Sequence, residues 1–349
     1  MGTSWPSSEP SSAGRGSWPA ELLEVWERSV TAEYGSLTRT GSPVTVPTTP
    51  YVSADGRTLD VSTGLTYPAK AERARRDPRV CLLFADPGGS GLDHPVMILV
   101  QGLATVRDAD LQANTDRYIR LSRRKLPEVT KGQPKFVLQR MGWYYARIWI
   151  EITPLHLRWW PSRLLDEEAQ SWHAPEGTAA PLSDPAPTGS QPKAWLTPPK
   201  SWRRGVEELC TRMALQDLTV VDANGFPMCV PVISTRLVDD GFVLQLGRGV
   251  PTLAEGPACL TMHAHPEKFT GQENHTFVGR VVPEECGTDH GVVVRMLVER
   301  ALADWSVAGS RAQSAIGFLR KGRLLAPRLR SEADRRFQPV PTVRFPARP

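Results

Sequence analysis

A short basic turn is the part of the sequence whose residue types and spacing best suit chemistry. The segment Ser62-Thr63-Gly64 ends a predicted strand and leads into a helix that carries Lys70 and Arg73. Hydroxyls and unpaired backbone N–H groups at such a turn, together with the electropositive helix start and two cations, can hold an anion. Lys70 and Arg73 are three residues apart and are therefore neighbours on one helix face. The alternative is a solvated helix with scattered charges.

A second group combines histidines with a carboxylate. His263 and His265 are two residues apart on a predicted strand, and Glu273 and His275 follow across a hairpin. Such a group can bind a divalent metal, or one imidazole can serve as an axial ligand to heme. The alternative is that these histidines lie on the surface or stabilise the hairpin, and we assign no metal ligand from the sequence. Because no Ser-His-Asp order, Cys-His order, Walker motif or dinucleotide-binding Gly motif stands out, no catalytic residue is assigned either.

Short strands and helices separated by turn signals must position these residues. Apolar and polar residues alternate in Arg57–Ser62, which predicts a strand. Lys70–Arg76 contains no Gly or Pro and is followed by Asp77-Pro78, which predicts a short helix. Trp143–Ile152 is predicted as a strand because its even-numbered residues from 144 onward are all apolar or aromatic. Asp289–Trp305 is predicted as a closing helix.

The two halves of the chain resemble each other. The pattern Gly-x-Pro-x-x-Val-Pro occurs at Gly41–Pro47 and again at Gly225–Pro231, at an offset of 184 residues. Three further matches follow in the same order: Val61–Gly64 with Leu244–Gly247, Cys81 with Cys259, and Gly102 with Gly279. Ordered matches with drifting offsets indicate a duplicated domain with insertions and deletions. The second copy is shorter after its Gly247 and lacks the basic character of the first, so we expect a degenerate site there. Cys81 and Cys259 are interpreted as small core residues.

Composition divides the chain into segments. Residues 1–16 are rich in Ser, Pro and Gly and are predicted to form a disordered tail. Residues 17–161 form the first domain, and residues 201–305 form the second. Residues 162–200 lose all periodicity and are predicted to be a poorly ordered linker. Residues 306–349 form a basic C-terminal tail in which no element is predicted.

The segment from Ser62 to Val80 resembles the flavin-phosphate segment of the pyridoxamine 5′-phosphate oxidase-like, FMN-binding split-barrel superfamily of flavin and deazaflavin oxidoreductases. It has a strand that ends in Ser-Thr, then Lys70, then a short basic helix closed by Asp77-Pro78-Arg79-Val80. The resemblance covers about residues 19–160 well and 205–305 weakly. It implies a mainly β fold with accessory helices, arranged as two tandem split β-barrels of which the first binds the flavin.

This resemblance also implies a cofactor and its contacts. The cofactor would be FMN, with a deazaflavin or heme as alternatives. The residues carried over from the family pattern are Thr45, Val46 and Pro47 along the isoalloxazine, Ser62, Thr63, Thr66, Lys70 and Arg73 at the phosphate, and Gln101 at the ring edge.

The implied function is an FMN-dependent or deazaflavin-dependent oxidoreductase that acts on an unidentified small molecule. Two alternatives stay open: a heme-binding or heme-degrading protein that uses a histidine of the second copy, and a non-catalytic flavin-binding module. The chain lacks the Arg-x-His signature of true pyridoxamine phosphate oxidases, so that reaction itself is not implied. Single-barrel members of the family usually dimerise, and two barrels in one chain predict a monomeric pseudo-dimer or a homodimer.

Charge and hydropathy restrict the partners and the cellular location that we expect. The net charge is +5, and the basic tail is accompanied by no motif that reads nucleic acid, so we expect no nucleic-acid partner. We find neither a long apolar span nor a signal peptide, so we expect a cytoplasmic protein that has no membrane contact and whose five cysteines are reduced.

Overall fold

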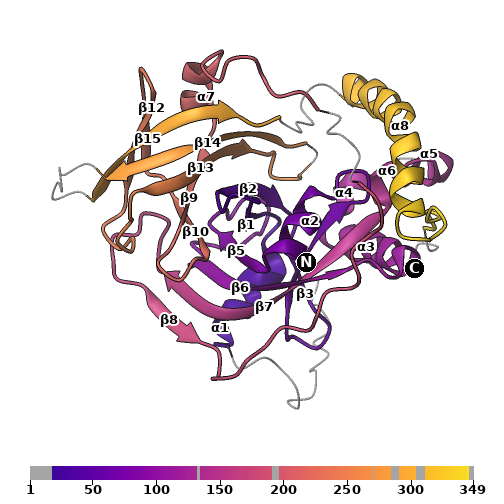
Figure 1. Ribbon diagram of the computed structural model, residues 1–349, viewed down its shortest axis with the longest axis horizontal. Coiled ribbons are helices and arrows are strands. Elements are labelled where there is room, and N and C mark those ends of the chain that lie inside the picture. The colour runs from indigo at the N-terminus through magenta and orange to yellow at the C-terminus, as the bar shows by residue number, and fades with distance from the viewer. Residues whose placement is uncertain are drawn as a thin grey trace, which may run out of the picture.

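Two curled antiparallel sheets, each formed by one half of the chain, make up the structure (Figure 1). The computed structural model describes residues 18–131, 134–190, 196–269, 271–283, 291–303 and 311–345. The tail predicted at residues 1–16 lies outside the described residues. Within them, no helix combines the length and the apolarity that crossing a bilayer requires.

The first sheet has the strand order β2-β1-β5-β6-β7-β4-β3, with β8 paired to β7. Its strands are β1 (Ala32–Leu37), β2 (Pro43–Thr48), β3 (Tyr51–Val52), β4 (Leu59–Gly64), β5 (Arg79–Phe84), β6 (Met97–Arg107), β7 (Arg147–Trp160) and β8 (Gln170–His173).

The second sheet repeats this order strand for strand, as β10-β9-β13-β14-β15-β12-β11. Its strands are β9 (Leu215–Val221), β10 (Pro227–Pro231), β11 (Ser234–Val238), β12 (Gly241–Leu246), β13 (Gly256–Ala264), β14 (Glu273–Pro283) and β15 (Val292–Ala301). The predicted fold class, mainly β with two tandem split barrels, is therefore confirmed.

Strand register confirms the predicted internal matches. Thr45 lies opposite Gly35, and its counterpart Cys229 lies opposite Thr219. The matched glycines Gly102 and Gly279 each follow a β-bulge in equivalent strands. A Cβ at either glycine would lie within 2.4 Å of a backbone carbonyl oxygen of the next strand, so no other residue fits there without a shift.

Accessory helices surround the first sheet more than the second. They are α1 (Glu21–Arg28), α2 (Ala69–Arg76), α3 (Leu111–Lys125), α4 (Pro127–Thr130), α5 (Lys135–Gln139), α6 (Gly142–Tyr145), α7 (Val206–Arg212) and α8 (Arg311–Asp334). Helix α2 forms where it was predicted, and it ends at Asp77, directly before Pro78. Its Ala71 and Ala74 pack into the core of the first sheet, which turns the charged face of the helix away from that core.

The two sheets share one core and pack reciprocally. Strand β2 packs against β9, β13 and β14, while its counterpart β10 packs against β1, β5 and β6. One hydrophobic cluster joins Leu83 and Met97 of the first half to Leu218, Val230 and Leu260 of the second. This reciprocity is the arrangement of a symmetric dimer, built here within one chain.

Three predictions about individual elements differ from the structure. Asp289–Trp305 was predicted as a helix, but its described part forms β15, because pairing with both β12 and β14 decides its conformation. The strand predicted from Trp143 begins at Arg147, after the helical turn α6. The linker, predicted to be poorly ordered, contains β8 and runs along the first sheet, where Asp184 bonds the backbone of Val106 and Asp108.

The basic C-terminal segment also forms structure that the sequence did not predict. Helix α8 packs Leu325, Leu329 and Ala333 into the core of the first sheet. Residues 306–310 and 346–349 lie outside the described residues.

Candidate anion-binding site

The turn between β4 and α2 brings together two of the predicted cations. Strand β4 ends at Gly64, the N–H of Tyr67 donates to the carbonyl of Gly64, and α2 starts after Pro68. Lys70 then projects toward β2, where its Nζ lies 3.4 Å from Thr48 Oγ1. Arg73, one helical turn later, donates from Nε to Ser36 Oγ at 2.9 Å. The predicted shared face of the helix is therefore directed at β1 and β2.

A third cation, Arg147, joins this group from β7. It pairs with Gly64 in the register between β4 and β7, which places its side chain on the same sheet face as Ser62. Its guanidinium lies 4.0 Å from the ring centroid of Tyr118 and 4.9 Å from that of Tyr144. Its Nε is buried and has no hydrogen-bond partner among the described residues.

These cations affect one another. Burial, and then the charges of Arg147 and Arg73, lower the pKa of Lys70 to about 7. Burial likewise lowers the pKa of Arg73. Among the described residues, none of the three forms an ion pair with a carboxylate. The three side chains are half-buried. Like charges that are partly withdrawn from water are costly unless an anion offsets them, so the group has the electrostatics of an anion site.

The predicted hydroxyl residues shape the turn. Thr63 Oγ1 donates to the carbonyl of Tyr67, and Thr66 Oγ1 donates to the carbonyl of Trp143. The carbonyl of Thr66 accepts a hydrogen bond from Arg328 of α8. Ser62 is buried on β4, opposite Trp149 of β7. The two threonines thus fix the loop that leads to Lys70. Ser62 lies two residues before Gly64, the residue that pairs with Arg147.

The predicted isoalloxazine residues lie on β2, where it packs against the second sheet. We call the region in which β2 and β10 pack against the opposite sheet the seam. Thr45 is fully buried: its Oγ1 is hydrogen-bonded to Thr219 Oγ1 at 2.6 Å, and its N–H donates to Cys259 Sγ. Val46 and Pro47 follow on β2 and are partly exposed. Gln101 is bonded elsewhere, since its amide donates to Asp222 and to the carbonyl of Pro227 in the second half. The structure therefore groups Lys70, Arg73 and the end of β2, and places Gln101 in a different contact.

The corresponding region of the second half lacks this group. Register places Gln245 and Leu246 where the first half has Ser62 and Thr63, and Gly291 where it has Arg147. Residues 247–255, which replace the turn and α2, contain no helix.

The histidines predicted as a possible metal or heme group do not converge. His265 Nε2 lies 2.5 Å from Asp86 Oδ2, and His275 Nε2 lies 3.1 Å from Glu273 Oε1. His263 instead faces Glu33 across the seam and Asp217 of β9, the strand paired with its own strand β13. Burial opposes protonation of His263, but hydrogen bonding and charge from Asp217 and Glu33 raise its pKa to about 10.

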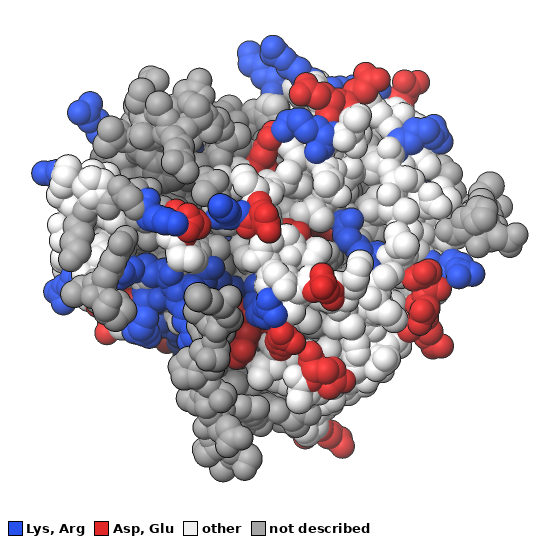
Figure 2. Space-filling model, turned by 180° about the vertical axis from the view of Figure 1, so that it is seen from behind, with Lys and Arg blue, Asp and Glu red and all other residues white. Residues whose placement is uncertain are grey.

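Positive charge gathers on one side of the molecule. Figure 2 shows Lys and Arg side chains dense on the left of the rear face, the side of α3 and α8, whereas acidic and neutral residues are interspersed elsewhere. A surface depression on that part of the molecule lies between the linker and α8, and includes none of the predicted site residues. It is lined by Thr188, Gly189, Pro327, Arg330, Ser331, Asp334 and Arg335.

Sequence reasoning missed Arg147 and Arg328. The strand prediction for Trp143–Ile152 used the apolar even-numbered face, and Arg147 lies on the other face. A cationic residue at the start of a largely apolar strand was the signal that could have revealed it. Arg328 lies in the segment where no element was predicted, so no local pattern connected it to Thr66.

Comparison with known proteins supplies structural similarities. No protein-family model matches the sequence, and no curated protein matches it. A solved structure described as F420 reductase is similar with 19% sequence identity and a TM-score of 0.31, over 40% of this chain and 98% of that one.

Two other similar structures differ in what they are described as binding. One is a pyridoxamine 5′-phosphate oxidase-related, FMN-binding protein from Nostoc punctiforme, with 14% identity, a TM-score of 0.27, and coverage of 40% of this chain and 78% of that one. The other is the heme storage protein HutZ from Vibrio cholerae, with 12% identity, a TM-score of 0.28, and coverage of 38% and 87%. The fold assignment itself rests on the strand order and register described above.

Proposed function

We propose that this tandem split-barrel protein binds one flavin per chain, with the flavin phosphate held by Lys70, Arg73 and Arg147, and that it acts as a flavin-dependent oxidoreductase. The observation that carries the proposal is the group of three half-buried cations, which has no carboxylate ion-pair partner among the described residues. A phosphate would offset their mutual repulsion and would accept from the buried Nε of Arg147.

The position of the group supports a flavin rather than an unspecific anion. Arg73 influences the pKa of Cys259 in the second barrel, so the cations lie beside the seam between barrels. A ring system attached to the phosphate could extend along Val46 and Pro47 of β2, which are partly exposed at that seam. The family resemblance of the segment from Ser62 to Val80 adds the same expectation. When bound, the flavin would supply hydride transfer, while the protein would orient the ring and the substrate.

FMN is the cofactor we propose first, because a terminal phosphate matches a compact group of cations. A deazaflavin carries a phosphate at a similar place and is the alternative within the same proposal. A heme protein is less well supported, because His263, His265 and His275 of the second barrel each contact a carboxylate. A non-catalytic flavin-binding module would use the same site and would differ only in showing no turnover.

The test is an absorbance spectrum of the purified full-length protein, followed by titration with FMN. We expect flavin bands or quenching of FMN fluorescence on addition, saturating at one FMN per chain. Arg147→Ala should weaken binding, whereas Arg248→Ala should not, because Arg248 lies in the second barrel and contacts the carbonyl of Asp166. A Soret band, or equal losses in both variants, would contradict the proposal, and binding of a deazaflavin in preference to FMN would change only the cofactor.

A further inference from the structure

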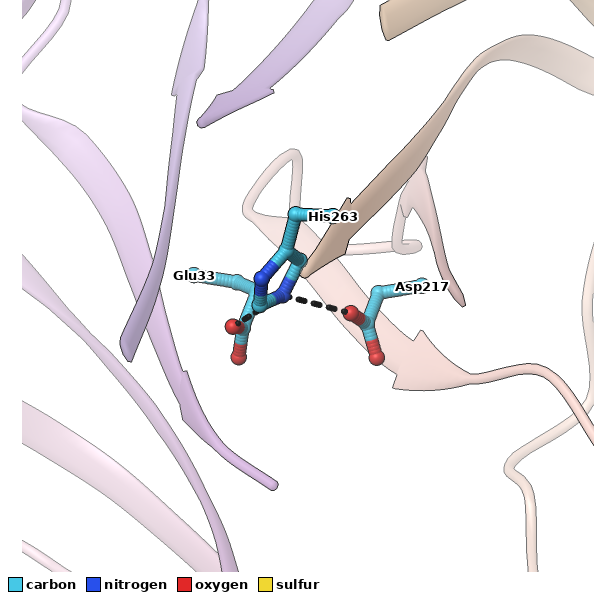
Figure 3. A group of neighbouring side chains, drawn as sticks. All are labelled: Glu33, Asp217 and His263. Carbon is cyan, nitrogen blue, oxygen red and sulfur yellow. Dashed lines mark ion pairs between the residues drawn. The ribbon is translucent and has the colours of Figure 1, made fainter. Parts of the chain in front are cut away.

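A histidine and two carboxylates from three strands meet at the seam between the barrels. Glu33 comes from β1, Asp217 from β9 and His263 from β13 (Figure 3). The imidazole lies between the two carboxylates, with Nε2 at 2.8 Å from Glu33 Oε1 and 3.6 Å from Asp217 Oδ2. We call these three residues the seam triad.

The duplication explains how the seam triad arises. Glu33 lies opposite Pro47 and Asp217 lies opposite Pro231, so the two acids occupy equivalent positions of the two barrels. His263 lies four residues after Cys259, and the first barrel has Ala85 four residues after Cys81. Because two equivalent acids approach the seam and only one barrel supplies a histidine, a single asymmetric group forms.

Burying these three polar side chains costs free energy unless hydrogen bonds or an ion offset the loss of water. The side chains of Glu33, Asp217 and His263 are exposed by 1% or less. His263 Nε2 and Glu33 Oε1 contact each other at 2.8 Å, whereas Glu33 Oε2 and His263 Nδ1 have no hydrogen-bond partner among the described residues. Buried polar atoms without partners point to a missing ligand or ion. Asp217 differs, because Arg163 lies 3.4 Å from its Oδ1 and leaves Oδ2 turned toward the imidazole.

The spacing of the donor atoms suits a metal ion. One donor atom from each residue can be chosen so that all three lie within 4.8 Å of one another. Around a tetrahedral ion with bonds of about 2.0–2.1 Å, neighbouring donor atoms are about 3.3 Å apart. The 3.6 Å distance to Asp217 already fits this value, and the 2.8 Å distance to Glu33 would have to open by roughly half an ångström.

Charge and donor chemistry agree with a divalent ion. A bound metal ion would displace the proton of His263, and two carboxylates with a neutral imidazole then carry a charge of −2, which a divalent cation cancels. Nitrogen and oxygen donors without a thiolate suit zinc and manganese among the common ions. Arg163 would orient Asp217 from behind, as residues outside a metal's ligands commonly do.

We propose that Glu33, Asp217 and His263 form a binding site for one divalent transition-metal ion, which joins the first barrel to the second. The ion would connect β1 of one barrel to β9 and β13 of the other. It is separate from the cation group at Lys70, and the proposal does not depend on flavin binding.

The experiment measures metal content and stability without any activity assay. The full-length protein is stripped with EDTA, incubated with Zn²⁺, passed through a desalting column and subjected to elemental analysis. We expect about one zinc ion per chain and a higher thermal unfolding midpoint that EDTA reverses. Glu33→Gln and His263→Gln should each lower zinc affinity at least roughly tenfold. His275→Gln is the matched control, since His275 contacts Glu273 away from the seam triad and the zinc should remain.

A second measurement covers the case in which the variants fail to fold. Co²⁺ bound to the wild-type protein should give visible ligand-field bands without thiolate-to-metal charge transfer, because no cysteine belongs to the seam triad. Failure of the wild-type chain to retain zinc would overturn the proposal. So would zinc retention that both variants leave unchanged, or a thiolate band in the Co²⁺ spectrum.

Discussion

The two barrels have the same strand order, but they differ at the point where β4 and β12 end. After β4 the first barrel has a tight turn, the basic helix α2 and Arg147 opposite the turn. After β12 the second barrel has an irregular segment and Gly291 at the position of Arg147. Both barrels nevertheless contribute equivalent strands, β2 and β10, to the seam.

This difference indicates what each barrel does. The second barrel retains the strands that build the shared core and lacks the group of cations that we propose to hold an anion, so its proposed role is a wall for the first barrel's candidate site. Two linked barrels also have a high effective concentration for each other, which favours the internal seam over an external one. The following predictions test this division, starting with the largest expected effect.

Removing Arg147 should have the largest effect on anion binding. Arg147→Ala deletes the guanidinium whose buried Nε has no hydrogen-bond partner in the described part of the chain. One charge-assisted interaction contributes about 2–3 kcal/mol, so FMN affinity should fall roughly 30- to 150-fold. Fluorescence titration measures the change, and Arg248→Ala in the second barrel should alter it less than about twofold. Comparable losses in the two variants would mean that the barrels share the binding role.

Making the first barrel resemble the second at Gly35 should reduce stability. Gly35 corresponds to Thr219, but a Cβ at Gly35 would lie 2.5 Å from the buried Cys81 Sγ and 3.2 Å from Thr45 Oγ1. Gly35→Thr should therefore lower the free energy of unfolding by about 1–3 kcal/mol. Urea denaturation tests this. Gly256→Thr is the control, because nothing lies within 4 Å of its added Cβ, and its change should stay within about 0.5 kcal/mol.

Lys70 should contribute less than Arg147 at neutral pH. Its pKa of about 7 means that roughly half of the ammonium groups are already neutral at that pH. We expect Lys70→Ala to weaken FMN binding by about 1–1.5 kcal/mol, or about five- to tenfold. Isothermal titration at pH 7 gives the value. A loss greater than that of Arg147→Ala would place the phosphate closer to α2 than to β7.

The pH dependence of binding should follow Lys70. In the free protein the pKa of Lys70 is lowered to about 7, and a bound phosphate would raise it, so binding above pH 7 takes up a proton. FMN affinity should fall about fivefold between pH 7 and pH 9. Lys70→Arg should flatten this profile, because a guanidinium does not titrate in that range. A wild-type profile as flat as that of Lys70→Arg would remove Lys70 from the site.

Local sequence patterns were sufficient to predict part of the candidate site and most of the fold. The strand that ends at Gly64, the helix with Lys70 and Arg73, and the matched segments at Gly41 and Gly225 all depend on neighbouring residues along the chain. Periodicity and turn residues encode such features directly.

Contacts between residues far apart in the sequence decided the rest of the fold and of the candidate site. Val292–Ala301 became a strand because two partners pair with it, although the sequence alone suggested a helix. Gln101 bonds Asp222, and Arg328 reaches Thr66, through contacts that no spacing encodes. The sequence by itself determined the duplicated strand order and the basic turn, since both follow from local composition. Only the tertiary structure decided that Arg147 joins Lys70 and that Glu33, Asp217 and His263 meet at the seam, because these groupings require the two barrels to pack in one specific register.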